Sequence, residues 1–249
     1  MKTRVVILCA GKGTRMGADI PKPLVEVSGQ PMVIHLLESI EVAGIDPNPI
    51  LVVSPDGLSH FGTFCEHVDC EYAIQEEQLG TGHAVLAARE VAGQADTIVV
   101  LYGDHPFIGS ELIDQLVVLR KSHPAPIAML TTKVPGFTKD YQHFMHWGRI
   151  IRDEIGNMVA SREYKDATEK ERAILEVNPG LYAFDAQWLW DHLADLENEN
   201  ASKEYYLTDL VEMAIEEGSG VVTELVENPF EVMGINTAEE LERAERIMG

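Results

Sequence analysis

The sequence has few cysteines and no long run of apolar residues. Its three cysteines, Cys9, Cys65 and Cys70, are odd in number and lack the spacing of a zinc site, which favours free thiols in a reducing compartment. The apolar run from Val5 to Ala10 is too short to span a bilayer or to form the core of a signal peptide. We therefore expect a cytoplasmic protein without a targeting or membrane segment.

Positive charge is also scarce, because 19 Lys and Arg side chains against 41 Asp and Glu give a formal net charge of -22. Such a surface repels nucleic acid and anionic lipid, so neither is an expected partner. A phosphate-binding site must then concentrate positive charge locally. Three basic residues, Lys12, Arg15 and Lys22, fall close together near the start of the chain. The overall acidity is equally compatible with adaptation to salt.

Short apolar runs alternate with amphipathic segments along the 249 residues, which are enough for one large α/β domain over 1–249. The predicted strands are 4–9, 49–54, 97–102, 126–133 and 220–226, and the predicted helices are 32–43, 81–91, 110–121, 205–217 and 237–248. Residues 135–147 lack periodicity and are predicted to form a loop over one edge of the site. This alternation predicts βαβ units around a mostly parallel sheet, with ligands bound beyond the carboxyl ends of the strands.

A glycine-rich turn follows the first predicted strand. Gly11 and Gly13 allow backbone N–H groups to approach a phosphate closely. The spacing is neither that of a P-loop nor that of a dinucleotide fingerprint, because Met16 stands where the fingerprint needs Gly or Ala. Further along, the prolines on either side of Lys22 restrict the backbone and should hold its ammonium in place.

Seven motifs in order resemble those of the sugar-phosphate nucleotidyltransferases, which implies a Rossmann-like, three-layer α/β fold with a mostly parallel mixed sheet. Within that family the chain is most similar to the N-terminal uridyltransferase domain of the bifunctional N-acetylglucosamine-1-phosphate uridyltransferase/glucosamine-1-phosphate acetyltransferases. The motifs are Leu-Cys-Ala-Gly-Lys-Gly-Thr-Arg-Met at 8–16 with Pro-Lys-Pro-Leu at 21–24, Gln-Glu-Glu-Gln-Leu-Gly-Thr-Gly-His-Ala at 75–84, Tyr-Gly-Asp at 102–104, Gly-Arg-Ile at 148–150, Lys-Asp-Ala-Thr at 165–168 with Glu-Val-Asn at 176–178, Glu-Tyr-Tyr-Leu-Thr-Asp at 204–209, and Gly-Ile-Asn at 234–236. The resemblance covers essentially the whole chain.

The resemblance implies transfer of a nucleotidyl group from UTP to N-acetylglucosamine 1-phosphate, with release of pyrophosphate. The positions that match the family's nucleotide site are Leu8, Ala10, Gly11, Gly13, Thr14, Lys22, Gln75, Gly80 and Thr81. Arg15 and Lys22 would neutralise charge on the triphosphate as the α-phosphorus is attacked. Gln75 carries both a donor and an acceptor, which suits the edge of uracil.

The same resemblance implies a magnesium site at Asp104 and Asn236. Mg²⁺ takes oxygen ligands and keeps several waters, so one carboxylate, one amide oxygen and the phosphates suffice. The implied sugar-binding residues are Tyr102, Gly103, Gly148, Glu163 and Asn178. No general base is needed, because a sugar 1-phosphate is already an oxyanion.

Two departures from the family pattern leave the sugar open. Pro179 stands where threonine is usual, which removes a hydroxyl and a backbone donor beside Asn178, and the loop before Gly148 is longer and more aromatic. Glucose 1-phosphate or another sugar 1-phosphate, with dTTP as a further nucleotide, is therefore an alternative. A glycosyltransferase would want an Asp-x-Asp motif where Gly103-Asp104-His105 stands, and a nucleotide sensor would not need both metal positions. The chain shows no hexapeptide repeats, so we expect no left-handed β-helix acetyltransferase domain, and the oligomeric state is not readable.

Overall fold

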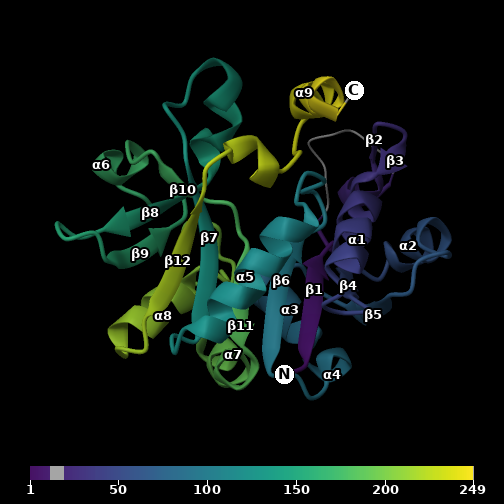
Figure 1. Ribbon diagram of the computed structural model, residues 1–249, viewed down its shortest axis with the longest axis horizontal. Coiled ribbons are helices and arrows are strands. Elements are labelled where there is room, and N and C mark those ends of the chain that lie inside the picture. Colours follow the sequence, from purple (N-terminus) through teal and green to yellow (C-terminus); the bar gives the residue numbers. More distant parts are fainter. Residues whose placement is uncertain (12–19, 249) are drawn as a thin grey trace.

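The protein is organised around a ten-stranded mixed sheet, seen in a computed structural model that describes residues 1–11 and 20–248 (Figure 1). The strands of this sheet are β1 (Thr3–Leu8), β4 (Ile50–Val53), β5 (Glu71–Ile74), β6 (Thr97–Tyr102), β7 (Ile127–Lys133), β8 (Gly148–Arg152), β9 (Met158–Arg162), β10 (Glu176–Asn178), β11 (Tyr182–Asp185) and β12 (Val221–Val226). Their order is β5-β4-β1-β6-β11-β7-β10-β8-β9, with β12 on the other edge of β7. A separate hairpin joins β2 (Glu26–Val27) to β3 (Gln30–Pro31).

The first half of the sheet is parallel, and its strands are buried on both faces. β1 pairs in parallel with β4 and with β6, and β4 pairs with β5. Val5 and Ile7 of β1 enter one core cluster whereas Val6 enters the other. A strand that is covered on both sides needs apolar residues at every position, which explains the continuous runs in the sequence.

The second half of the sheet is interrupted beside β7. β11 pairs antiparallel with the first half of β7, and β10 pairs with its end, so that both lie along the same edge. The chain breaks between them at 179–181, where Gly180 has φ +82°, a conformation that glycine adopts without strain. This break turns Asn178 and its neighbours towards the end of the sheet at which β1 and β6 also terminate.

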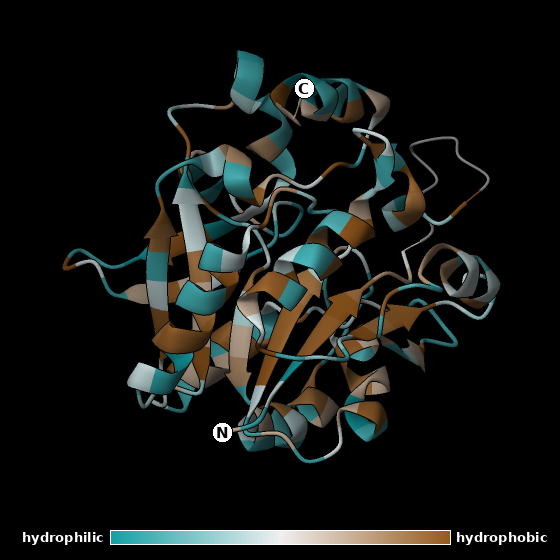
Figure 2. Ribbon diagram, turned by 45° about the vertical axis from the view of Figure 1, so that its right-hand side comes forward, coloured by the Kyte–Doolittle hydropathy of each residue, from teal (hydrophilic) through white to brown (hydrophobic). Residues whose placement is uncertain are grey.

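Helices cover both faces of the sheet and give three layers. The helices are α1 (Met32–Ala43), α2 (Leu58–Phe64), α3 (Thr81–Ala87), α4 (Arg89–Ala92), α5 (Ser110–Ser122), α6 (Glu169–Arg172), α7 (Ala186–His192), α8 (Asp209–Glu216) and α9 (Ala238–Met248). Residues of α1, α2 and α5 share one core cluster, and those of α3, α4, α7 and α8 share the other. Figure 2 shows that the central strands are apolar, whereas the helices around them carry both apolar and polar residues. None of the helices within the described residues has the length and apolar character needed to cross a bilayer.

Three predicted elements differ from the structure. The predicted helix at 81–91 is divided into α3 and α4, and the helix predicted at 205–217 begins only at Asp209. The predicted loop at 135–147, which we call the insert, contains the 3-10 helix η3 (Lys139–His146). Phe144 of η3 is fully buried, and Arg149 donates hydrogen bonds to the carbonyl groups of Met145 and Trp147. Aromatic packing and this buried guanidinium therefore order the insert, and neither feature produces a periodic pattern in the sequence.

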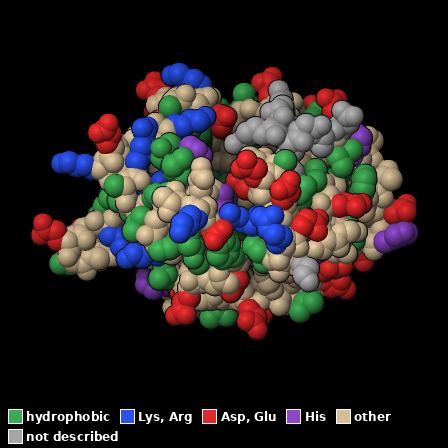
Figure 3. Space-filling view, turned by 90° about the horizontal axis from the view of Figure 1, so that it is seen from above, with side chains coloured by type: hydrophobic (Ala, Val, Ile, Leu, Met, Phe, Trp, Pro, Cys, Tyr) green, Lys and Arg blue, Asp and Glu red, His purple; other side chains and the backbone are tan. Residues whose placement is uncertain are grey.

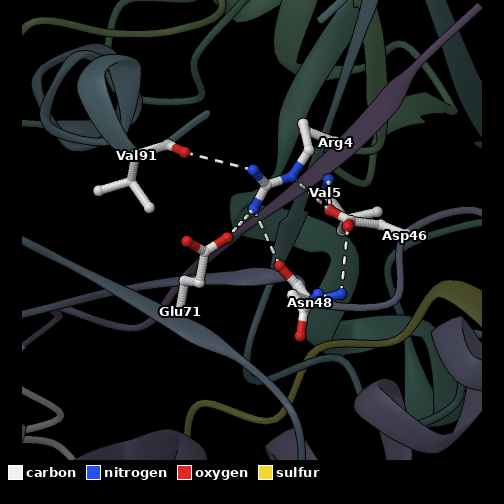
Figure 4. A network of polar contacts seen from close by, with 6 residues as sticks. All are labelled: Arg4, Val5, Asp46, Asn48, Glu71 and Val91. Atoms are coloured by element: carbon white, nitrogen blue, oxygen red, sulfur yellow. Dashed lines mark hydrogen bonds and ion pairs between the residues drawn. The ribbon is translucent and has the colours of Figure 1, made fainter. Parts of the chain in front are cut away.

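A buried polar network closes the amino-terminal end of the parallel sheet (Figure 4). The Arg4 guanidinium donates to Asp46 Oδ2 at 3.0 Å, Glu71 Oε2 at 2.5 Å and the Asn48 carbonyl oxygen at 2.9 Å. Asp46 also accepts from the backbone N–H of Val5 at 2.8 Å. Each charge is thus paired and hydrogen-bonded, which buried charges require. The network fixes the strands at the end opposite the pocket described next.

Candidate active site

A cavity of about 460 Å³ lies at the carboxyl ends of β1 and β6, where ligands bind in parallel α/β sheets. It is lined by Leu8, Cys9, Ala10, Gly11, Lys22, Pro23, Gln75, Gln78, Gly80, Thr81, Ala84, Tyr102, Asp104 and Glu204. Nine of these lining residues were singled out in the sequence as nucleotide, sugar or metal contacts. The predicted contacts Gly13, Thr14 and Arg15 lie outside the described residues. Figure 3 looks onto this edge, where acidic and basic side chains are interspersed.

Lys22, Asp104 and Asn236 converge at one end of the cavity. Lys22 is the first residue of the 3-10 helix η2 (Lys22–Leu24), and Asp104 follows β6. The Lys22 ammonium forms an ion pair with Asp104 Oδ2 and lies 2.8 Å from Asn236 Oδ1. One cation thus contacts both oxygens predicted to bind a metal. The two oxygens are placed to hold a cation between them, which fits the magnesium expectation.

The Asp104 carboxyl is held in its charged form. Burial alone would raise its pKa, but the neighbouring Lys22 ammonium and His105 outweigh burial and keep the pKa well below its ordinary value. The backbone supports this placement, because Ile235 N–H donates to the Asp104 carbonyl oxygen at 2.9 Å. That hydrogen bond brings Asn236 to Asp104 from more than a hundred residues away.

Gly103 permits the tight turn that presents Asp104. A Cβ at this position would lie 2.6 Å from Cys9 Sγ and 3.0 Å from Pro23 Cβ. Real Cβ atoms do not tolerate such distances, so a side chain here would push the strand end away from η2. Gly103 therefore sets the distance between Asp104 and Lys22.

Gln75, at the end of β5, is oriented by its own neighbours. Its Nε2 lies 3.1 Å from both the Gly80 carbonyl oxygen and His83 Nδ1, and the residue is only 3% exposed. Both donor hydrogens are therefore directed into the protein. Gln75 lines the cavity, and within the described part of the chain no hydrogen bond reaches its Oε1.

The segment around Gly80 is paired with a distant stretch of backbone. Tyr205 N–H donates to the Leu79 carbonyl oxygen, and Gly82 N–H donates to the Tyr205 carbonyl oxygen, each at 2.8 Å. Thr81 Oγ1 accepts from Leu207 N–H at 2.9 Å. The Thr81 hydroxyl thus holds the cavity wall together, a role that sequence reasoning did not assign.

The predicted sugar-side residues are also brought together. A Cβ at Gly148 would lie 3.5 Å from Asn178 Cβ and 3.6 Å from Glu163 Oε1, and one at Gly180 would lie 2.5 Å from the Tyr102 ring. Glu163 accepts from the Thr208 hydroxyl at 3.1 Å, and burial raises the pKa of its carboxyl. These residues therefore form one cluster beside the cavity that Lys22 and Gln75 line.

The Asn178 side chain is engaged within the protein. Its Nδ2 donates to Ser161 Oγ at 3.0 Å and to the Tyr182 hydroxyl at 2.5 Å, and its Oδ1 accepts from Gly180 N–H at 2.8 Å. Ser161 and Tyr182 were not identified from the sequence, because a hydroxyl that serves another side chain has no local signature. Asn178 fastens the break between β10 and β11, so its amide has little capacity left for a ligand.

A second cavity of about 500 Å³ adjoins Glu163 and is strongly acidic. It is lined by carboxylates that include Asp166, Asp209 and Glu212. Burial, together with the charges of Glu212 and Glu163, raises the pKa of Asp209 to about 7. The lining of this second cavity is thus mainly acidic, whereas the first cavity contains the Lys22–Asp104 ion pair.

Comparison with known proteins places the chain in a family. A profile described as the MobA-like NTP transferase domain matches residues 5–179. The chain belongs to this family. The matched range of the MobA-like NTP transferases includes Lys22, Asp104 and Asn178, whereas Asn236 lies beyond it.

Curated relatives and a solved structure agree with this assignment. The bifunctional protein GlmU of Caldicellulosiruptor saccharolyticus is 37% identical over 246 residues, which cover 98% of this chain and 51% of that protein. GlmU of Pseudomonas fluorescens is 39% identical over 246 residues, with coverages of 99% and 51%. The chain thus spans about half the length of the curated relatives it matches. A crystal structure from Bacillus anthracis, assigned as a glucose-1-phosphate thymidylyltransferase, has a TM-score of 0.77 at 17% identity and covers 98% of this chain and 94% of that one, which confirms the predicted Rossmann-like fold.

Proposed function

We propose that this chain transfers a nucleotidyl group from UTP to N-acetylglucosamine 1-phosphate and releases pyrophosphate, with Mg²⁺ as cofactor. The convergence of Lys22, Asp104 and Asn236 at one end of a cavity that carries Gln75 at the other is the observation that supports this most. One end suits the phosphates of a nucleotide, and the other suits a base. The resemblance to GlmU over almost the whole chain supports the same reaction.

The orientation of Gln75 favours a base with a ring N–H. Since both donors of its amide face the protein, Oε1 is left to accept from N3–H of uracil or thymine. Cytosine presents a ring acceptor at that position, which would face another acceptor and lose the hydrogen bond. The geometry therefore favours UTP or dTTP over CTP and does not separate UTP from dTTP.

The chemistry follows from placement and charge. Lys22 neutralises the phosphates at the reacting end, Gln75 and Gly80 hold the base, and Gly148 and Glu163 border the sugar phosphate. Asp104 and Asn236 would hold Mg²⁺, which would neutralise the developing charge on the triphosphate. Orienting two anions so that they can react contributes much of the rate by itself. Arg15, by its sequence motif, would add a second positive charge.

Transfer to glucose 1-phosphate, with UTP or dTTP, is a second candidate. The engagement of the Asn178 amide with Ser161 and Tyr182 favours it, because an acetamido group then finds fewer partners. Pro179 also lacks an N–H beside this group. The assignment of the Bacillus anthracis structural neighbour as a thymidylyltransferase is in keeping with this alternative.

Pyrophosphate release measured across four nucleotides and both sugar 1-phosphates tests the proposal. We expect UTP with N-acetylglucosamine 1-phosphate to give the highest kcat/KM, with a preference over glucose 1-phosphate on the order of ten-fold, equivalent to ~1.4 kcal/mol. Asp104→Asn should abolish most turnover, whereas Asp114→Asn, which changes an exposed carboxylate on α5, should not. A higher kcat/KM for glucose 1-phosphate would establish the second candidate, equal values would refute the preference for N-acetylglucosamine 1-phosphate, and the absence of pyrophosphate release with every pair would refute transfer.

A further inference from the structure

His105 is buried directly behind the proposed metal site. It ends the turn that begins at Tyr102, and only 7% of its surface is exposed. Its ring lies edge-on to Tyr102, with centroids 5.7 Å apart, and to Trp147 of the insert, at 6.0 Å. The imidazole therefore joins the end of β6 to the insert that precedes Gly148.

The same ring also supports the chain segment that carries Asn236. A Cβ at Gly234 would lie 2.7 Å from His105 Nε2 and 3.1 Å from its two neighbouring ring carbons. The backbone at Gly234 thus rests on the imidazole, while the next N–H, of Ile235, bonds to the Asp104 carbonyl oxygen. His105 therefore touches both segments that supply the predicted metal ligands.

One nitrogen of His105 faces Asp104 without a hydrogen-bonding partner. Nδ1 lies 3.1 Å from Asp104 Oδ1. Within the described part of the chain this buried nitrogen has no aligned partner, because the two groups are close but not in hydrogen-bonding orientation. The other carboxylate oxygen, Oδ2, is taken by the Lys22 ammonium. A small rotation of the Asp104 carboxylate would align Oδ1 with Nδ1.

Ligating carboxylates are commonly oriented by hydrogen bonds from groups outside the ligand set. A buried donor that lacks a partner is energetically costly, so a rearrangement that supplies a partner is favoured. We propose that His105 is a positioning residue of the metal site. It donates from Nδ1 to Asp104 Oδ1, which fixes Oδ2 towards Asn236, and its ring sets the distance of the Gly234–Asn236 backbone. This inference rests on the proposed magnesium-dependent function.

Metal binding without turnover gives the most direct test. Mn²⁺ is titrated into the protein in the presence of saturating UTP and no sugar phosphate, and free Mn²⁺ is followed by electron paramagnetic resonance. We expect His105→Val to weaken Mn²⁺ binding at least about ten-fold. His105→Asn, whose amide nitrogen falls near the place of Nδ1, should recover affinity to within roughly three-fold of the parent.

A second histidine whose ring contains a buried nitrogen provides the matched control. His143 lies in the insert, and its Nε2 is likewise a buried nitrogen without a partner among the described residues. Its ring packs against that of Phe144 in a tilted arrangement, with centroids 4.0 Å apart. His143→Val should therefore leave Mn²⁺ affinity unchanged, and circular dichroism checks that each variant is folded.

Three results would overturn the positioning role. The first is parental Mn²⁺ affinity in His105→Val. The second is an equal loss of affinity in His105→Val and His105→Asn, because the ring would then act through packing alone. The third is a parent protein that binds no Mn²⁺ in the presence of UTP. Failure of the proposed function looks different. A parent that binds Mn²⁺ in a His105-dependent way but releases no pyrophosphate with any sugar 1-phosphate would retain the positioning role and lose the transfer reaction.

Discussion

Substituting Gly80 with alanine should break the contact between the two halves of the nucleotide cavity. Gly80 has φ +123° and ψ 176°, a region that residues other than glycine hardly populate, at a cost of roughly 1–3 kcal/mol. An added Cβ would also lie 2.5 Å from the Tyr205 carbonyl oxygen and 2.6 Å from its nitrogen. Both are backbone atoms, so they cannot rotate away as the end of a side chain could.

The magnitude follows from the hydrogen bonds that must separate. Tyr205 N–H to Leu79 and Gly82 N–H to the Tyr205 carbonyl oxygen contribute about 1 kcal/mol each. Added to the backbone strain, this gives a loss of roughly 3–5 kcal/mol for Gly80→Ala. The loss should appear as a lower urea midpoint with an unchanged slope, and as a higher KM for the nucleotide because Gln75 loses the carbonyl oxygen that orients it.

Gly44→Ala is the matched control. Gly44 ends α1 with φ +63° and ψ 24°, and nothing lies within 4 Å of a Cβ built on it. Only left-handed strain remains there, so we expect a loss of about 1–2 kcal/mol and no change in KM. If Gly80→Ala lost no more stability than Gly44→Ala and kept its KM, the close approach of Tyr205 would not be what requires glycine.

Three further substitutions test other parts of the structure. Lys22→Ala should lower kcat roughly 10²-fold or more, because its charge stabilises the transition state; a rise in nucleotide KM alone would instead mark Lys22 as a ground-state binding residue. Arg4→Met should lower the free energy of unfolding by roughly 3–5 kcal/mol without changing KM, because it leaves the buried Asp46 carboxylate without its guanidinium; a loss below about 1 kcal/mol in urea unfolding would refute that. The folded-state pKa of Asp209 is about 7, above its ordinary 3.8, so its contribution to stability is lost as the pH rises through that value. Asp209→Asn should therefore gain stability relative to the parent as the pH rises from about 4 to about 7 in urea unfolding, with little further change above pH 7, and a constant difference would contradict the raised pKa.

Three strands of the parallel half of the sheet were predictable because their signal is local, whereas β5, with its exposed Glu71, was missed. β1, β4 and β6 are continuous apolar runs, and strands buried on both faces must be so. β8 to β11 were missed because each is only three to five residues long, and β10 and β11 are separated only by the break at 179–181. The two pieces α3 and α4 share one helical pattern, and nothing in that pattern marks the junction at Ala88.

The residues of the site were predictable from the sequence, but the contacts between their side chains were not. Motif resemblance named Lys22, Asp104 and Asn236, and the structure brings their side chains together. The place of the Lys22 ammonium between the predicted metal ligands Asp104 and Asn236 was not foreseen, because it depends on where the Ile235 backbone bonds to Asp104. Likewise, the engagement of Asn178 by Ser161 and Tyr182 depends on neighbouring strands. Sequence spacing carries no information about which long-range partner reaches a side chain first.

The docking of Ile235 on Asp104 has a consequence for how the protein is made. At the usual pace of translation, the segment that carries Asn236 leaves the ribosome roughly ten seconds after Asp104. During that interval the strands on either side of Asp104 are free to pair, although Asn236 has not yet left the ribosome. Lys22, synthesised earlier, is already there to balance the carboxylate as it becomes enclosed. The Lys22 ammonium, which lies between the predicted ligand oxygens of Asp104 and Asn236, therefore gives the growing chain a counter-charge for Asp104 before the site is complete.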